Sequence, residues 1–465
     1  MLENINIFIH HRDIRLQDNT TLDDMSQHIN NIIPIFIFTP EQIDPYKNKY
    51  FSNNLVQFMC ESLLELKKEY KKNNGTINFF KGDTIDVLKE IHKKYKIINI
   101  GFNVDYSPYA RKRDNMIISW ANKEKINIFS SEDLLLKELL KGDTKSPNSN
   151  DPYKVFTPFM KNLKSSFEVT SVNKKIPKVL KKKLKIKYII NKTQINNFYQ
   201  VNNELNVMSG RKEAIKKLKN INKQKQYDKM RNCLTYNTTN LSSYINLGLL
   251  SIREVYHYIV KHLGKENGII NELYWRDFYY NVLYFFPHVV GNSFKLNYDK
   301  IKWRNNMTQF KAWCDGNTGF PIVDACMRQI NRTGYMHNRG RMIVASFLTK
   351  DLLIDWKWGE QYFATKLQDY NISANNGGWQ WTAGTGTDSQ PYFRIFNPWS
   401  QSKSYDPNCN YIKKWIPELD QVNDNDIHNW DKKYKNYNDI VYYKPIVDHK
   451  QERLNTLKVY KKYIN

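Results

Sequence analysis

Short runs of β-branched and aromatic residues alternate with longer amphipathic segments over the first 130 residues. The segments 52–70 and 87–95 carry apolar and polar residues at helical spacing. Strands that alternate with helices are typical of βαβ units, in which parallel strands form one sheet covered by helices. We therefore expect residues 1–130 to form an α/β domain with a doubly wound parallel sheet. The predicted strands are INIFI at 5–9, IIPIFIF at 32–38, INFF at 77–80 and IINIGF at 97–102.

This pattern is lost between residues 131 and 205. KGDTKSPNSNDPY at 141–153 is rich in turn-forming residues, and KKIPKVLKKKLKIK at 174–187 is rich in lysine. The composition predicts an interdomain linker over 131–205. We interpret the lysine run as a solvated segment, with a nucleic-acid-binding patch as the alternative.

From residue 206 to residue 465 the apolar residues return at helical spacing, as in 253–263, 271–286 and 341–354, and no strand pattern is evident. This region is therefore expected to be a larger all-helical domain. One stretch within it, NNGGWQWTAGTGTDSQPYFRIFNP at 375–398, has neither helical nor strand periodicity. Its glycines, tryptophans and amides indicate that something other than a hydrophobic core shaped it.

The charge of the chain points to a polyanionic partner. Its 465 residues include 71 Lys and Arg against 46 Asp and Glu, a formal net charge of +25. Such an excess attracts nucleic acid and makes binding salt-dependent. The alternative is an AT-rich coding bias, which also enriches lysine and asparagine.

Cysteine usage and hydropathy exclude several classes of protein. The five cysteines form no CxxC pair and no His-Cys cluster, which argues against zinc or iron-sulfur sites and against a disulfide scaffold. No segment reaches the roughly 18 continuous apolar residues of a membrane span. We expect a soluble intracellular protein, in the cytoplasm or the nucleus depending on the host, with no metal.

Two predicted helix faces mix polar and apolar groups. Glu272, Trp275 and Arg276 share one face, and Asn338 and Met342 share another. A carboxylate, an indole and a guanidinium together suit a cavity that hydrogen-bonds one edge of a flat ligand and stacks on its plane. TTNLSSYINLGLLS, from Thr238, places hydroxyl groups before a helical pattern; this favours an anion site or, alternatively, an ordinary N-cap.

Several of these residues belong to longer motifs that occur in a fixed order. They are ELYWRDFY at 272–279, GFPIVDACMRQ at 319–329, GYMHNRGRMIVASFLTKDLLIDW at 334–356, NNGGWQW at 375–381 and YFRIFNP at 392–398. Together they resemble the flavin-binding half of the photolyase/cryptochrome family, and most closely the photolyases that repair cyclobutane pyrimidine dimers. HRDIRLQDN at 11–19 and YKVFTPF at 153–159 extend a weaker resemblance toward the N-terminus.

The resemblance implies FAD as cofactor. Arg341 and Asp369 are similar to the pair beside the isoalloxazine ring, and Asn375 to the residue facing flavin N5. Asn371 departs from the family, which usually has a second aspartate there; the lost charge would alter flavin redox tuning. The pyrophosphate segment and a further FAD contact map onto Thr238, Thr239, Asn240, Leu241, Ser242 and Tyr227.

The resemblance also implies how damaged DNA is bound. Glu272 is similar to the carboxyl group that hydrogen-bonds the dimer, and Trp275 and Trp381 to the indoles that stack on it after it is flipped from the duplex. Asn338 and Met342 line the same pocket. The residues similar to the DNA-facing rim are Arg231, Arg276, Arg339, Arg394 and Lys403.

Trp379, Trp356 and Trp303 resemble the family's relay, which carries electrons to photoexcited oxidised flavin. The expected activity is that of a carbon–carbon lyase acting as a monomer. Reduced anionic FAD donates an electron to a cyclobutane dimer under blue light, the ring splits, and the electron returns. One alternative is a cryptochrome-like photoreceptor. Another is a six-four photolyase, although that group carries histidines where this chain has Asn338 and Met342.

The resemblance does not identify the second, light-harvesting chromophore of the family. Ser107 stands where folate-binding relatives carry a glutamate, and His11 stands where an arginine is expected. A deazaflavin or another flavin are the alternatives to folate, as is the absence of any antenna.

Overall fold

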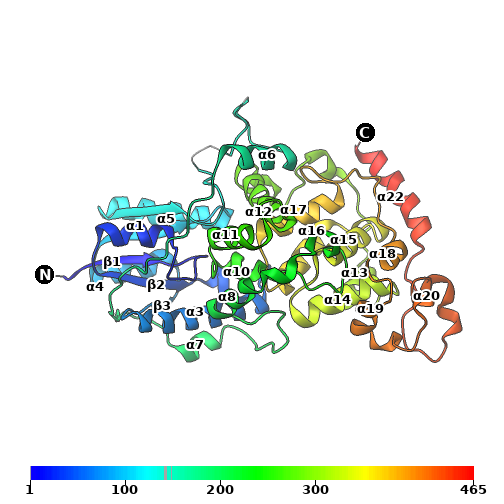
Figure 1. The fold of residues 1–465 in the computed structure, drawn as a ribbon, viewed down its shortest axis with the longest axis horizontal. Coiled ribbons are helices and arrows are strands. Elements are labelled where there is room, and N and C mark those ends of the chain that lie inside the picture. Colours follow the sequence, from blue (N-terminus) through cyan, green and yellow to red (C-terminus); the bar gives the residue numbers. More distant parts are fainter. Residues whose placement is uncertain (1, 141–143, 148, 465) are drawn as a thin grey trace. The chain divides into compact units, whose positions relative to one another are not determined.

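The computed structural model describes residues 2–140, 144–147 and 149–464 of the chain (Figure 1). The chain divides into two compact units. The first unit comprises residues 1–202, 207–225 and 239–285, and the second comprises 203–206, 226–238 and 286–465. The predicted domain boundaries at 130 and 205 remain predictions, because this division follows spatial contacts rather than function.

The first unit contains a five-stranded parallel sheet in the order β3-β2-β1-β4-β5. The sheet confirms the predicted α/β class and the four predicted strands. The edge strand β5 was not predicted, because four of the six residues in its sequence NIFSSE are polar. The bounds are β1 Asn4–Ile9, β2 Ile32–Phe38, β3 Asn78–Lys81, β4 Lys96–Val104 and β5 Asn127–Glu132.

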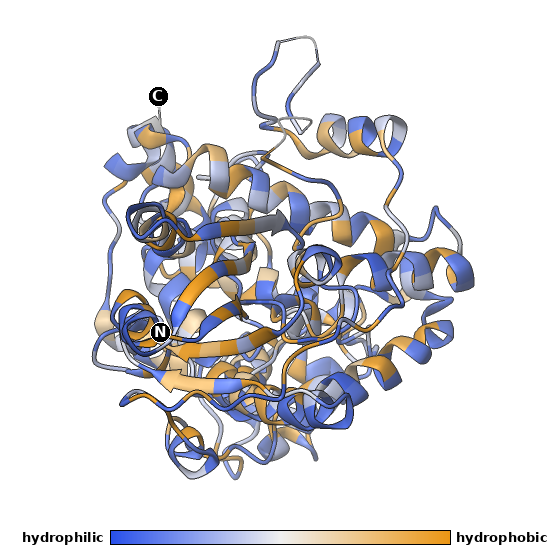
Figure 2. Ribbon diagram, turned by 90° about the vertical axis from the view of Figure 1, so that its left-hand side faces the viewer, coloured by the Kyte–Doolittle hydropathy of each residue, from blue (hydrophilic) through white to orange (hydrophobic). Residues whose placement is uncertain are grey.

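Helices cover both faces of this sheet. Val87, Leu88 and Ile91 of α4 and Ile117 of α5 join one core with the isoleucines of the strands. Gly101 of β4 faces α1, where a Cβ atom would overlap the sulfur of Met25. Figure 2 shows hydrophobic residues concentrated on the strands. The helices are α1 Thr20–His28, α2 Pro40–Ile43, α3 Asn53–Lys72, α4 Thr84–Lys94 and α5 Pro108–Lys123.

A buried network of four charged side chains holds the chain after β1 to the region after β5. Asp133 pairs with Arg15, and its Oδ1 accepts a hydrogen bond from Arg253 Nη2 at 2.8 Å. Arg253 Nε also donates to Asp18 Oδ2 at 3.1 Å. Burial alone would raise the pKa of Asp133, but Arg15 and Arg253 hold it below its usual range. The carboxylate therefore stabilises two buried guanidinium groups.

Replacing Asp133 with asparagine is expected to lower the free energy of unfolding by about 3–5 kcal/mol, because buried Arg15 loses its carboxylate and Arg253 keeps only Asp18. A lowered pKa means that this stabilisation is present above the usual carboxyl pKa of about 3.9 and is lost only as the pH falls through the folded-state value. Urea unfolding followed by circular dichroism at pH 7 and at pH 5 should give the same difference between variant and wild type. A difference that disappears by pH 5 would contradict this account.

The segment 131–205 contains two helices and an extended stretch that packs on the sheet edge. Leu180 N donates to Ile32 O at 2.7 Å, and Leu184 and Ile186 are buried in the α/β core. Lys181, Lys183, Lys185 and Lys187 are exposed between these contacts, and Lys182 is partly buried. The connecting segment is therefore ordered against the first unit. Its helices are α6 Phe156–Ser166 and α7 Lys192–Asn196.

The described residues beyond β5 form helices and no further strand within a sheet, as predicted for this part of the chain. No helix among the described residues has the length and apolar character to cross a bilayer. In the first unit the helices are α8 Arg211–Lys219, α10 Ser242–Asn246, α11 Ile252–Leu263 and α12 Gly268–Phe285.

The second unit is helical and is built around a core rich in tryptophan, which includes Trp313, Trp356, Trp379 and Trp430. Its helices are α9 Tyr227–Met230, α13 Met307–Asp315, α14 Pro321–Thr333, α15 Asn338–Ser346, α16 Trp356–Lys366, α17 Ile372–Ala383, α18 Pro398–Tyr405, α19 Asn410–Trp415, α20 Asp424–Ile427, α21 Trp430–Lys433 and α22 His449–Ile464. A π-helical turn, Phe347–Asp351, follows α15.

The prediction of an irregular stretch from residue 375 was wrong for its first nine residues, which lie in α17. The helix is capped at its start by the Asn371 side chain and at its end by Gly384, whose φ is +84°. Burial of Trp379 and Gln380 offsets the low helix propensity of the glycines.

Candidate functional site

A partly buried ion pair belongs to the predicted flavin site in the second unit. Arg341 Nη2 lies 3.1 Å from Asp369 Oδ1 and 3.0 Å from Oδ2, and Arg341 Nε donates to the Met336 carbonyl at 2.8 Å. The Asp369 side chain is only 4% exposed. The pair therefore presents a fixed cation and a fixed anion side by side, as the resemblance implies for a flavin edge.

Thr238 belongs to the same neighbourhood. Its hydroxyl lies 3.5 Å from the Tyr335 hydroxyl, and the Arg341 guanidinium lies over the Tyr335 ring at 5.5 Å. The rest of the predicted phosphate segment, Thr239 to Ser242, belongs to the first unit and leads into α10. There Asn240 has a φ of +51°, and Leu241 N donates to Thr239 Oγ1 at 3.4 Å. Tyr227 begins α9 and is half-buried.

His337 is a buried group of this site that sequence reasoning missed. Burial, with the charges of Arg341 and Arg339, lowers its pKa to about 4, so the ring is neutral at pH 7. Its Nδ1 accepts the Arg339 N–H at 3.1 Å, which leaves the proton on Nε2. Nε2 has no hydrogen-bond partner in the described part of the chain. A buried donor of this kind fits a ligand acceptor, and its place within YMHNRGRM is the signal that would have found it.

Helix α17 carries the two predicted flavin-contacting asparagines. Asn371 Oδ1 accepts from Ser373 N and Ala374 N, both at 3.1 Å, and from Ser373 Oγ at 2.6 Å. Asparagine therefore keeps the capping function that an aspartate would have, without the charge. Asn375 Nδ2 donates to the Glu360 carbonyl at 3.0 Å.

Gly378, one turn after Asn375 in α17, fits a ligand on this helix face. A Cβ atom added to Gly378 would meet no protein atom within 4 Å. Packing within the protein therefore does not require glycine there, although glycine lowers helix stability by about 1 kcal/mol relative to alanine. Close approach of a flat cofactor would require it. With the buried His337 donor and the Arg341–Asp369 pair, the residues present fit FAD.

The predicted substrate residues fall into two groups, one in each unit. In α15, Asn338 Nδ2 lies 3.7 Å from Met342 Sδ, which confirms that they share a face, and Trp381 of α17 is half-buried in the same unit. Glu272 and Trp275 lie in α12 of the first unit, where both are half-buried.

The predicted DNA-contacting cations differ in their surroundings. Arg339 Nη2 donates to Asn232 Oδ1 at 2.8 Å, and its guanidinium lies over the Tyr405 ring at 4.4 Å. Burial and the neighbouring charge of Arg231 lower the pKa of Arg339. Two like charges held together in this way suit a phosphate. Arg394 and Lys403 are exposed.

Arg276 is more enclosed than the other four cations. Its Nη1 donates to the Leu134 carbonyl at 2.8 Å and to Asp277 Oδ1 at 3.2 Å. Burial raises the pKa of Asp277 to about 7, against the effect of Arg276. These contacts give Arg276 a structural function beside its predicted contact with DNA.

The three predicted relay tryptophans belong to one aromatic core in the second unit. Trp379 and Trp356 are buried in it, and Trp303 packs against it while partly exposed. Trp379 and Trp356 are 3% and 1% exposed, and Trp303 is the most exposed of the three. Trp313, which the sequence did not single out, meets Trp379 edge to face at 6.0 Å.

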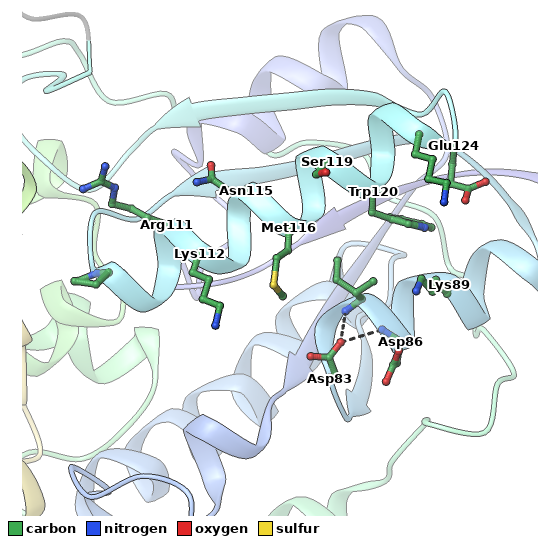
Figure 3. Close-up of a pocket in the computed structure, with 13 residues that line it drawn as sticks. Asp83, Asp86, Lys89, Arg111, Lys112, Asn115, Met116, Ser119, Trp120 and Glu124 are labelled. Carbon is green, nitrogen blue, oxygen red and sulfur yellow. Dashed lines mark hydrogen bonds between the residues drawn. The ribbon is translucent and has the colours of Figure 1, made fainter.

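Two hollows of the first unit are lined by residues other than the predicted substrate and DNA-contacting ones. A cavity of about 10 Å³ lies at the carboxyl ends of β1 and β4, the point where strand order reverses. His11 and Arg113 contact there at 2.9 Å; burial, with the charge of Arg113, lowers the pKa of His11 to about 3. A groove of about 1110 Å³ between α4 and α5 carries charges of both signs, including Asp83, Lys89 and Arg111 (Figure 3).

Comparisons with known proteins identify the family to which the chain belongs. The profile of the FAD binding domain of DNA photolyase matches residues 269–462, and that of DNA photolyase matches residues 6–180. A deoxyribodipyrimidine photo-lyase from Buchnera aphidicola is 36% identical over 492 residues, covering 98% of this chain and 96% of its own. The chain belongs to the DNA photolyase family.

Solved structures agree with this assignment and with the fold. An archaeal photolyase from Sulfolobus tokodaii, crystallised with two FAD molecules, is similar at a TM-score of 0.85 and 35% identity, covering 99% of this chain and 100% of that one. A class III photolyase from Agrobacterium tumefaciens is similar at a TM-score of 0.90 and 28% identity, covering 100% and 98%. The predicted pairing of an α/β domain with a helical flavin-binding domain is confirmed.

Proposed function

We propose that this protein repairs cyclobutane pyrimidine dimers in DNA in a light-driven reaction that uses reduced anionic FAD. The observation that carries the proposal is the Asn338–Met342 contact on α15, within one turn of the Arg341–Asp369 pair. Met342 is an apolar group and Asn338 a neutral amide, a combination that suits an uncharged pyrimidine dimer better than histidines do. The near full-length similarity to a deoxyribodipyrimidine photo-lyase supports the same conclusion.

When bound and reduced, FAD supplies the excited-state electron that the chemistry needs. Arg341 and Asp369 orient the ring edge, Asn375 hydrogen-bonds it, and the His337 Nε2–H donates to an acceptor on the cofactor. Tyr227 and the hydroxyl-rich segment from Thr238 to Ser242 hold the pyrophosphate. Asn371 keeps α17 capped without adding a negative charge near the ring.

The substrate residues act on an extruded dimer. Glu272 hydrogen-bonds the dimer and stabilises charge that develops on its carbonyl. Trp275 and Trp381 stack on the dimer, and Asn338 and Met342 contact it. A dimer stacks poorly in duplex DNA, so extruding it costs less than extruding a normal base. The phosphates around it contact Arg231, Arg276, Arg339, Arg394 and Lys403.

Trp379, Trp356 and Trp303 pass electrons inward when the bound flavin is oxidised, and the protein acts as a monomer. The second FAD of the Sulfolobus relative, which is described as a light-harvesting cofactor, makes a flavin the specific candidate for a second chromophore.

A cryptochrome-like photoreceptor is the second candidate function. The observation that favours it is Asn371, because removal of a negative charge near the flavin alters which redox state is stable. The retained set of Glu272, Trp275, Asn338, Met342 and Trp381 weighs against it, as it does against repair of the six-four photoproduct.

Blue light is expected to convert an oligonucleotide with one cyclobutane thymine dimer back to two thymines when the purified protein carries reduced FAD. A dark sample and a six-four oligonucleotide serve as controls, and chromatography of the products gives the yield. Binding should weaken steeply as salt rises, because the basic surface releases counterions. Protein that binds FAD and DNA but leaves the dimer intact in light would favour the photoreceptor.

A further inference from the structure

Phe156, at the start of α6, lies flat against Trp275 of α12. The two ring centroids are 3.7 Å apart and the ring planes differ by only 7°. Both residues belong to the first unit, and α6 packs beside α12 (Figure 1). Phe156 is buried, whereas Trp275 is half-buried. The phenyl ring thus covers one face of the indole, and the Tyr279 ring meets the indole at a tilt of 32° with centroids 5.6 Å apart.

This face-to-face arrangement is imposed by the packing around it. Isolated aromatic rings prefer offset or edge-to-face contacts with centroids about 4.5–7 Å apart. Phe278, which is fully buried, meets Phe156 edge on at 5.9 Å and Trp275 edge on at 5.7 Å. Phe159, one turn further along α6, contacts Phe278 at 5.5 Å. Phe278 therefore supports both stacked rings from the side.

We propose that Phe156 is a positioning residue that holds the Trp275 indole in one orientation and leaves its opposite face for the extruded dimer. The inference rests on the proposed role of Trp275 as a stacking platform. Without such a support, a half-buried indole would populate several rotamers, and binding of the dimer would have to select one of these rotamers. A prearranged indole avoids that cost.

The inference also assigns a function to a segment whose sequence reads as a connection between domains. α6 lies within residues 131–205, and its sequence VFTPF places Phe156 in the first turn and Phe159 three residues later. One phenylalanine thereby reaches Trp275, whereas the other contacts Phe278 and Tyr153. The connecting segment contributes to the substrate site through this contact.

The test compares Phe156→Leu, Phe156→Tyr and the matched control Phe159→Leu in the full-length protein with bound FAD. Dissociation constants are measured for an oligonucleotide with one cyclobutane thymine dimer and for the undamaged oligonucleotide. Phe156→Leu should weaken dimer binding by about tenfold, a typical effect of losing orientation, while binding of undamaged DNA stays the same. Phe156→Tyr, which keeps the aromatic face, should restore dimer binding, and Phe159→Leu should retain it.

Equal affinity of Phe156→Leu and wild type for the dimer would overturn the inference. Tighter binding would also overturn it, because Phe156 would then occupy the place of the dimer. Trp275→Ala distinguishes the role of Trp275 from that of Phe156. Wild-type dimer affinity in that variant overturns the role of Trp275 itself. Weak binding in Trp275→Ala with normal binding in Phe156→Leu overturns only the role of Phe156. If Phe156→Leu loses FAD, Phe156→Met provides the same comparison.

Discussion

Replacing Trp356 with phenylalanine is expected to slow light-driven reduction of bound oxidised FAD by about tenfold or more, an added barrier of at least about 1.4 kcal/mol. Phenylalanine fills most of the buried space of Trp356, but a benzene ring loses an electron far less readily than an indole. Absorbance of the oxidised flavin under blue light with an external reductant measures the effect. Dimer repair by the same variant after chemical reduction of its FAD should match the wild type.

Trp313→Phe is the matched control for this experiment. Trp313 is as buried as Trp356, belongs to the same core and contacts Trp379 edge to face at 6.0 Å, but it lies outside the proposed relay. The FAD bound to the Trp313→Phe variant should therefore be photoreduced at the wild-type rate. If Trp313→Phe slows photoreduction as much as Trp356→Phe does, electrons travel by a different route through the aromatic core.

The α/β part of the fold could be predicted from sequence because its signals are local. β2 is a continuous apolar run, and β1, β3 and β4 are rich in isoleucine or phenylalanine, as strands buried on both faces of a parallel sheet require. β5 gave no such signal, because an edge strand with partly exposed residues needs no apolar run. Its place follows from pairing with β4, a contact that no local pattern encodes.

α17 shows the opposite case, in which tertiary structure overrides local preference. Two adjacent glycines and a run of amides argue against a helix, and sequence reasoning placed an irregular segment there. The helix forms because Asn371 caps it, Asn376 Nδ2 bonds the Val289 carbonyl at 2.9 Å, and Trp379 is buried. Val289 lies 87 positions from Asn376 in the sequence, so propensity alone could not reveal this contact.

The identities of the site residues followed from motifs, but their contacts did not. The sequence indicated Arg341 and Asp369, and the structure brings them together across 28 positions. Nothing in the sequence indicated that His337 would keep a buried N–H without a partner, or that Phe156 would cover Trp275. Both facts depend on which side chains meet after folding, and motif spacing does not contain that information.

The Asp369→Asn variant is expected to purify with less than about a tenth of the wild-type FAD, a loss of at least about 1.4 kcal/mol of binding free energy. The substitution keeps the shape of the side chain but removes the charge that faces Arg341. The guanidinium, which is 27% exposed, then lies beside the cofactor without its anion. Removing one partner of such a pair is costly, although partial exposure of Arg341 moderates the effect. The ratio of flavin absorbance to protein absorbance measures FAD content.

Glu418→Gln is the control that isolates the location of the charge. Glu418 also pairs with an arginine, Arg328, at 2.7 Å in the same unit, but the Glu418 side chain is 36% exposed. Removing its charge should leave FAD content unchanged. Full FAD content in Asp369→Asn would show that the Arg341–Asp369 pair maintains the fold rather than the cofactor. The flavin site would then have to depend on the asparagines of α17 and the hydroxyl-rich segment at Thr238, which makes Asn375→Ala the variant that loses FAD instead.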